Sequence, residues 1–210
     1  MSASETHNRK NLNRSIDDSL QGFPAVAERL RQGGIEVLGA MAVAFGCPFE
    51  GDVPLETVLR IARTYAELGV RHITLGDTTG MATPRNIRAT LRALRAELPE
   101  MEFTLHLHNT RGVGLANVLV GLEEGAAIRF RCRRLGRLPF AAGATGNICT
   151  EDLVYLLHES GLETGIDLEK TIAIAHRMER LLGKPLAGQV MRAGPRLRLH
   201  AADAVPTAAG

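Results

Sequence analysis

Two histidines on one short segment are the side chains of this sequence best suited to metal chemistry. They stand in Leu105-His106-Leu107-His108-Asn109, within an apolar run typical of a β-strand. Because side chains alternate along a strand, His106 and His108 are expected to point to the same side. Two neighbouring imidazoles can occupy adjacent positions on one divalent metal ion. The alternative is that both are polar side chains at a strand end that bind only water.

Three other side chains follow predicted strands and carry weaker signals. Asp77 in Gly-Asp-Thr-Thr-Gly can act as a base, orient a ligand or cap the next turn, and taken alone the turn is favoured. Asn147 in Gly-Ala-Thr-Gly-Asn offers a neutral oxygen donor, although by itself it is also typical of a turn. Cys47 is interpreted as a small packed residue at a strand end.

An arginine-rich stretch covers residues 129–137, with five arginines in nine residues. Such a cluster is typical of a nucleic-acid or phosphate patch. That interpretation fits poorly, because the stretch follows a predicted buried strand and offers no partner for so much charge.

Helical and strand-like patterns alternate along the chain. Each predicted strand is followed by a short polar or glycine-rich segment, as expected of βαβ units with a parallel sheet. We predict strands over 35–45, 72–75, 103–107 and 126–130, the tail of another over Ser2–Glu5, and helices over 15–33, 54–68, 83–98, 115–123, 151–159 and 168–182. Ser15, Thr83, Thr150 and Asp167 are the predicted helix caps.

These patterns predict an α/β domain over residues 1–192, followed by a loose alanine-rich tail over 193–210. In a (β/α)8 barrel the segments after the strands line the carboxyl-terminal face, where chemistry occurs. A complete barrel needs eight strands in about 250 residues. The chain is therefore expected to form either an open doubly wound domain or an incomplete TIM barrel.

Composition narrows the class of protein. Lys and Arg total 25 and Asp and Glu total 23, so the net charge is +2, and neither a nucleic acid nor a membrane is expected as a partner. No apolar stretch approaches the roughly 20 residues of a membrane span. The polar start lacks the apolar region of a signal peptide, so a cytoplasmic location and free thiols at the three cysteines are expected.

Several long segments together resemble the 3-hydroxy-3-methylglutaryl-CoA lyase family of metal-dependent TIM-barrel enzymes. They occur in the family's order over residues 2–195: SASETHNRKNLNRSIDDSL, FGCPFEG, LGDTTGMATP, LHLHNTRGVGLANVLVGLEEG and PFAAGATGNICTEDLVYLL. The resemblance implies a TIM barrel to which this chain supplies the end of strand four and strands five to eight. It also implies an acyl-CoA substrate, a place in leucine breakdown, and a Mg²⁺ or Mn²⁺ ion held by His106, His108 and Asn147.

The implied reaction splits 3-hydroxy-3-methylglutaryl-CoA into acetyl-CoA and acetoacetate. A hard cation chelates the tertiary hydroxyl and a carbonyl oxygen and lowers the pKa of the hydroxyl. The resemblance then implies that Asp77 or His106 removes the proton. A Claisen-type acyl-CoA synthase of the same superfamily and a non-catalytic remnant or subunit are the alternatives, and a homodimer is an open expectation.

Two departures from the family pattern stand out. The amino-terminal segment, which supplies strands one to three with a metal-binding Asp and a neighbouring Arg, has no counterpart in residues 1–210, and Leu138 occupies the place of the family's catalytic Cys. Read one base later, codons for Leu135–Pro139 can encode Leu-Gly-Gly-Cys-Pro, the family's loop. We hypothesise a pair of compensating frameshifts between about codons 130 and 139; true divergence is the rival explanation.

Overall fold

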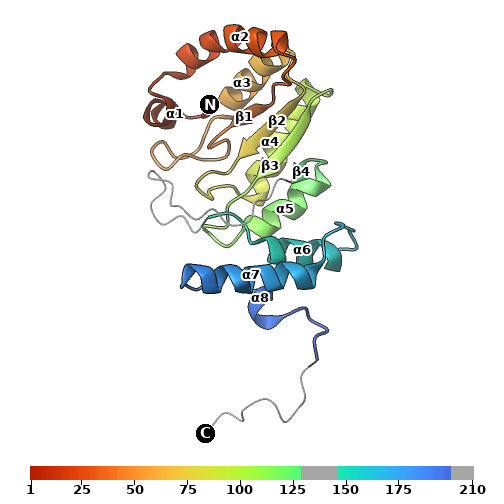
Figure 1. Cartoon of the computed structure of the whole chain (residues 1–210). Coiled ribbons are helices and arrows are strands. Elements are labelled where there is room, and N and C mark those ends of the chain that lie inside the picture. Colours follow the sequence, from red (N-terminus) through yellow and green to blue (C-terminus); the bar gives the residue numbers. More distant parts are fainter. Residues whose placement is uncertain (129–145, 200–210) are drawn as a thin grey trace. The chain divides into compact units, whose positions relative to one another are not determined.

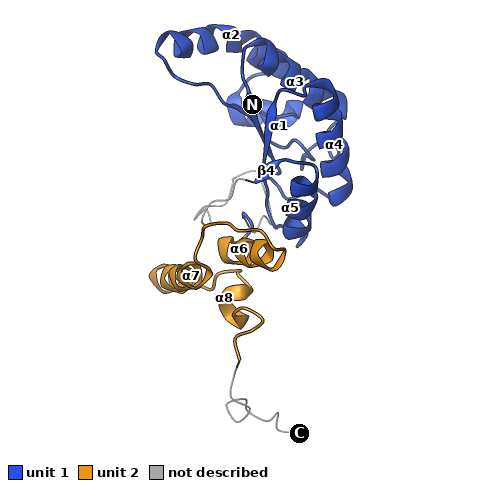
Figure 2. Cartoon of the chain, turned by 90° about the vertical axis from the view of Figure 1, so that its right-hand side faces the viewer, with its two compact units in different colours: residues 1–148 blue, residues 149–210 orange. Residues whose placement is uncertain are grey.

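The computed structural model describes residues 1–128 and 146–199. The chain forms two compact units, Met1–Ile148 and Cys149–Gly210, coloured separately in Figure 2. Each unit is described by itself. The arginine-rich stretch 129–137 and Leu138 lie outside the described residues, and the division into a domain over 1–192 and a tail over 193–210 stays a prediction.

A parallel sheet forms the centre of the first unit (Figure 1). Its strands follow one another in chain order: β1 Gly39–Met41, β2 His72–Gly76, β3 Glu102–His106 and β4 Ala127–Ile128. The predicted α/β architecture with a parallel sheet is thus confirmed. Thr74 pairs with Thr104 and Gly76 with His106, so that β2 and β3 end side by side.

Helices cover one face of this sheet. The first unit contains α1 Glu5–Leu12, α2 Ile16–Gln32, α3 Leu55–Glu67, α4 Pro84–Glu97 and α5 Gly114–Glu123. Figure 2 shows α3, α4 and α5 along one side of the strands. The ring of Tyr65 in α3 packs at Gly39, and Gly121 in α5 packs at Leu105. On this side Ile73, Leu75, Phe103 and Leu105 are buried and form the core with the helices.

The opposite face of the sheet carries small and polar side chains. Alternation places Ala40, His72, Thr74 and His106 there, and each of them is partly or fully exposed. His72 Nε2 is hydrogen-bonded to the hydroxyl of Thr104 at 2.5 Å. This face therefore differs from the apolar sheet faces that a doubly wound fold buries under helices on both sides.

Two predicted strands differ from those in the structure. The predicted strand over 35–45 is reduced to β1, since Ile35 and Leu38 are 55% and 49% exposed and make no sheet pairing. Of the predicted strand over Ser2–Glu5, the structure has a single parallel bridge, between Ser2 and Ala42. Glu5 already begins α1, whose first turn is capped by the Ser4 side chain.

The predicted caps are mostly confirmed. Ser15 and Asp18 form a capping box at α2, Thr83 forms one with Asn86 at α4, and the Asp167 side chain accepts from the backbone N–H of Lys170. The prediction for Thr150 is wrong, because Cys149 is the N-cap residue and Thr150 is already helical.

The second unit is helical, with α6 Thr150–Glu159, α7 Leu168–Leu182 and α8 Val190–Ala193. Ile172 and Ala175 of α7 pack with Val190 and Met191 of α8 in a small apolar core. The Asp152 carboxylate fixes the start of α8 by accepting from the backbone N–H groups of Gln189 and Val190, at 2.9 and 2.7 Å. Within 1–128 and 146–199, no helix has both the length and the apolar character required to cross a membrane.

Candidate active site

His106 and His108 lie together at the carboxyl end of β3. Their ring centroids are 5.4 Å apart and the rings meet edge to face, at an interplanar angle of 75°. His106 is half-buried, whereas His108 is only 7% exposed. The alternation expected of a strand thus brings both imidazoles to one side, within reach of a common ligand.

Asn147 is brought to His108 by backbone pairing. The two residues form an isolated antiparallel bridge. On either side of it, Asn109 N donates to Gly146 O at 3.0 Å and Ile148 N donates to Leu107 O at 3.4 Å. Asn147 is itself buried, at 8% exposure. A segment remote in sequence therefore lies fixed against the strand end that carries the two histidines.

Gly114, at the start of α5, makes this close approach possible. A Cβ atom there would lie 2.6 Å from Cγ2 of Ile148 and 3.0 Å from the carbonyl oxygen of His108. The Gly114 backbone N–H also donates to Oδ1 of Asn109 at 2.9 Å. Sequence reasoning did not single out Gly114; its signal is only that a glycine precedes the predicted helix over 115–123, six positions after His108.

Asp77 is a buried carboxylate beside the same strand end, with 1% of its surface exposed. Its backbone N–H donates to the carbonyl of His106 at 2.9 Å. Its Oδ1 accepts from the backbone N–H groups of Met81 and Ala82, at 2.7 and 2.9 Å. The turn role predicted for Asp77 is present, because this carboxylate fixes the loop between β2 and α4.

Burial raises the pKa of the Asp77 carboxyl above its usual range. The backbone N–H groups of Ala82, Met81 and His108 and the charge of Arg111 act in the opposite direction. Arg111 also donates from Nη1 to the carbonyls of Thr79 and Gly80, at 3.1 and 2.8 Å. Sequence reasoning passed over Arg111, although it lies only three residues after His108.

A cavity of about 390 Å³ opens beside His106. Most of its wall consists of small or polar side chains in or just after β1, β2 and β3, together with Met1 and one residue of α1. The lining residues are Met1, Asn11, Ala40, Met41, Ala42, Thr74, Gly76, Thr78 and His106. Of the predicted site residues only His106 reaches this cavity.

Cys47 is a packed residue, as its sequence context predicts. It is fully buried, the Ser4 hydroxyl donates to its Sγ at 2.9 Å, and the Phe49 backbone N–H donates to it at 3.4 Å. A sulfur enclosed in this way has no access to a ligand. The family's cysteine position, Leu138, lies outside the described residues.

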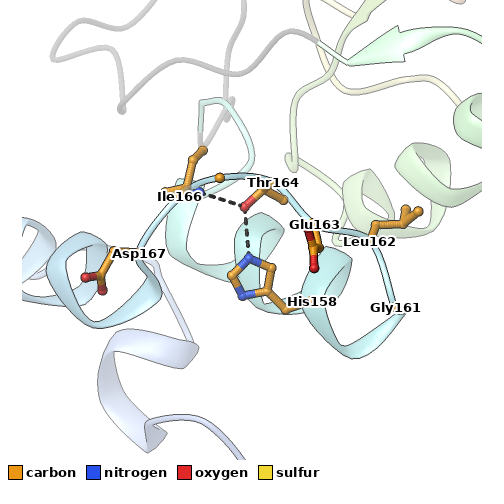
Figure 3. Close-up of a pocket in the computed structure, with 8 residues that line it drawn as sticks. His158, Gly161, Leu162, Glu163, Thr164, Ile166 and Asp167 are labelled. Atoms are coloured by element: carbon orange, nitrogen blue, oxygen red, sulfur yellow. Dashed lines mark hydrogen bonds between the residues drawn. The ribbon is translucent and has the colours of Figure 1, made fainter.

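A second hollow, of about 660 Å³, lies in the helical unit at the α6–α7 connection (Figure 3). Thr164 is one of the residues that line it; its hydroxyl lies 2.9 Å from Nε2 of His158 and accepts from the Ile166 backbone N–H at 3.1 Å. None of the predicted site residues lines it. These hydrogen bonds hold the connection itself in shape.

The described residues contain no group of three or more His, Cys, Asp and Glu side chains able to hold a metal ion. The arrangement around β3 consists of two imidazoles and one amide, with Asp77 behind them in the loop. Imidazole nitrogen and amide oxygen can bind a divalent cation, but three such donors do not complete its coordination shell. The described part of the chain thus offers a partial set of donors.

Comparison with known proteins adds the decisive observation: residues 1–178 match the profile of the HMGL-like family. The chain is a member of the HMGL-like family. It is 40% identical over 187 residues to the hydroxymethylglutaryl-CoA lyase YngG of Bacillus subtilis, covering 89% of this chain and 62% of that protein. It is also 40% identical over 196 residues to the (R)-citramalyl-CoA lyase of Chloroflexus aurantiacus, covering 93% and 62%.

Solved structures agree with this membership. An HMG-CoA lyase from Acinetobacter baumannii, in complex with coenzyme A and 3-methylmalate, superposes with a TM-score of 0.88 at 42% identity, covering 96% of this chain and 66% of that one. The predicted resemblance to the lyase family, and to carbon–carbon lyases as an enzyme class, is thereby confirmed. The chain spans only about 62% of the length of these two curated relatives.

Proposed function

We propose that this chain belongs to a metal-dependent lyase that cleaves 3-hydroxy-3-methylglutaryl-CoA into acetyl-CoA and acetoacetate. One observation carries the proposal: His106, His108 and Asn147 gather at the carboxyl end of β3, where enzymes built on β/α barrels carry their chemistry. Relatives at about 40% identity are acyl-CoA lyases by name.

The donor set suits a divalent cation, Mg²⁺ or Mn²⁺. His106 and His108 would supply imidazole nitrogens and Asn147 an amide oxygen, with further ligands coming from outside these three residues. When bound, the cation would polarise the substrate's tertiary hydroxyl and carbonyl oxygens. Backbone pairing between His108 and Asn147 supports the proposal, because it fixes these two donors relative to each other.

The proton on the substrate hydroxyl would pass to His106 or Asp77. A raised pKa makes the Asp77 carboxylate a stronger base than an ordinary aspartate once it is ionised. His106, however, lines the cavity, whereas Asp77 is buried behind the loop that its Oδ1 holds. A neutral imidazole has a single lone pair, so His106 would accept this proton only while it does not bind the cation, and Asp77 would be the base if His106 stays a ligand. The backbone N–H of Asp77 holds the carbonyl of His106 in place.

Removal of this proton would let the carbon–carbon bond next to the hydroxyl-bearing carbon break. That carbon becomes the ketone of acetoacetate. The electron pair of the broken bond passes to the carbon beside the thioester, as an enolate that takes up a proton and leaves as acetyl-CoA. Stabilising such developing charge in a closed site typically contributes a factor of about 10²–10³ per donor.

We further propose that the chain forms part of a TIM barrel. Residues Met1–Ala3 would represent the end of strand four, and β1 to β4 would represent strands five to eight. Two features support this arrangement: Ser2 pairs in parallel with Ala42, and one sheet face is small and polar like a barrel interior. We also propose, from the sequence, a domain over 1–192 followed by a loose tail, a cytoplasmic location and a homodimer.

The test is an assay of the purified chain with Mg²⁺ or Mn²⁺ on two thioesters. Cleavage of 3-hydroxy-3-methylglutaryl-CoA with release of acetoacetate supports the proposal. Preference for citramalyl-CoA, which the equally similar Chloroflexus relative makes a second candidate, would replace the substrate. Condensation without cleavage would favour the synthase alternative, and no turnover of either thioester would favour a non-catalytic remnant or subunit.

A further inference from the structure

Val43 has an unusual backbone conformation directly after β1. Its φ is 49°, in the left-handed region, and its side chain is completely buried. A β-branched residue rarely adopts this conformation, because its branched side chain makes it sterically unfavourable. Asn13 is the other non-glycine residue with positive φ in the described part of the chain, and it stands at the end of α1, where asparagine is common. The conformation of Val43 therefore requires support from its surroundings.

Hydrogen bonds donated by three consecutive backbone N–H groups supply that support. Ala42 N donates to Met1 O at 2.8 Å, and Ala44 N donates to Gly76 O at 3.0 Å. Between them, Val43 N donates to Oγ1 of Thr78 at 3.0 Å. The outer two bonds end on backbone carbonyls that any residue provides, whereas the central bond depends on the identity of one side chain.

The same residues form the wall of the cavity beside His106. Ala42, Gly76 and Thr78 all line it. Gly76 is itself in close contact with the chain leaving β1, since a Cβ atom there would lie 3.2 Å from Met41 O. A change in the conformation of Val43 would move Ala42 and so alter the shape of the cavity next to His106.

We propose that Thr78 is a positioning residue of the candidate active site. Its hydroxyl accepts from the backbone N–H of Val43, holds that residue in the left-handed conformation, and thereby sets the shape of the cavity wall beside His106, against which the acyl group would bind. The role in acyl binding rests on the proposed lyase function. The hydrogen bond and the strained residue are features of this chain's own structure.

The proposal separates an action through Val43 from a direct contact between the Thr78 hydroxyl and a ligand. Glycine adopts positive φ without a steric penalty. If Thr78 acts through Val43, then Val43→Gly should compensate for loss of the hydroxyl in Thr78→Val. If the hydroxyl contacts a ligand directly, Val43→Gly restores nothing.

The first measurement is amide hydrogen exchange at position 43 in the full chain, which needs no activity. Thr78→Val should speed exchange there by about tenfold or more, as expected when a buried hydrogen bond is lost, and Thr78→Ser should leave it unchanged. Thr79→Val is the matched control, because the Thr79 hydroxyl of the same loop is buried and has no hydrogen-bond partner within the described residues. Unchanged exchange in Thr78→Val overturns the proposal.

The second measurement is the affinity for 3-hydroxy-3-methylglutaryl-CoA by calorimetry, with KM and kcat where the chain turns over. We expect Thr78→Val to weaken binding about tenfold, chiefly as a rise in KM, and Thr78→Val with Val43→Gly to return to within about threefold of the wild type. A double variant as weak as Thr78→Val, or a Thr79→Val control equally impaired, overturns it. A wild-type chain that neither binds nor cleaves the thioester contradicts the proposed function, while the exchange result still decides whether Thr78 holds Val43.

Discussion

The backbone of Asn147 pairs with that of His108 in an antiparallel bridge. The pairing joins the segment after residue 145 to the carboxyl end of β3, and Gly114 leaves the room for it. A side chain that looks like an ordinary turn asparagine in the sequence is therefore held beside a buried histidine. This relationship is the structural basis of the proposed metal site.

Gly114→Ala should disturb that pairing. The added Cβ would meet the Ile148 side chain and the carbonyl of His108, and a backbone carbonyl has little freedom to move. We expect a loss of about 1–3 kcal/mol in the free energy of unfolding, measured by urea denaturation, with weaker Mn²⁺ binding.

Gly22→Ala is the matched control for Gly114→Ala. Gly22 lies inside α2, and its added Cβ would approach only the Arg14 side chain, at 3.4 Å. Alanine is favoured over glycine within a helix, so this variant should gain up to about 1 kcal/mol. Equal destabilisation by both substitutions would show that Gly114 has no special role.

Asp77→Asn should change how stability depends on pH. Burial raises the pKa of Asp77, so the folded protein binds this proton more tightly than the unfolded chain does. The contribution of Asp77 to stability is therefore greatest in acid and is lost as pH rises through its folded-state pKa.

The free energy of unfolding of Asp77→Asn, relative to that of the wild type, should consequently increase from about pH 4 toward neutrality. Asparagine keeps the oxygen that accepts from Met81 and Ala82, so the loop itself should persist. Urea denaturation across this pH range measures the difference, and a difference independent of pH would show that the carboxyl is not destabilised by burial.

Arg111→Gln should raise the pKa of Asp77 further, because the Arg111 charge lowers it in the wild type. The same pH series of urea denaturation then shows its transition at higher pH. Arg85→Gln, which removes an exposed charge at the start of α4, is the control for a change in net charge alone. Identical profiles for the two variants would exclude a specific effect of Arg111 on Asp77.

The sequence was informative where local rules decide the structure. Alternation along a strand sufficed to place His106 and His108 on one side, and short-range hydrogen bonding sufficed for the caps at Ser15 and Asp167. The helix α1 was missed because its buried residues, His7 and Asn8, are polar and leave no apolar periodicity.

The sequence could not predict features that depend on contacts between distant segments of the chain. Nothing in the sequence around Asn147 indicates a bridge to His108, and nothing around Val43 indicates a positive φ supported by Thr78. Apolar periodicity also failed at Ile35 and Leu38, because an apolar run predicts a strand even where no neighbouring strand pairs with it.

The frameshift hypothesis for residues 130–139 concerns the gene rather than the fold. It predicts that resequencing the source DNA will reveal base changes that restore Leu-Gly-Gly-Cys-Pro in place of Leu135–Pro139. Bases that stand as translated would contradict it and favour divergence of this loop.

Mn²⁺ binding tests the central claim, that His106, His108 and Asn147 hold a divalent cation. Electron paramagnetic resonance titration of the full chain should show one Mn²⁺ site, weakened at least about 10–100-fold in His108→Ala and Asn147→Ala, since even groups that only support metal ligands cost that much when lost. His158→Ala, a histidine of the α6–α7 hollow, should bind like the wild type. Absence of binding by the wild type, or equal binding by the wild type and His108→Ala, would contradict the account.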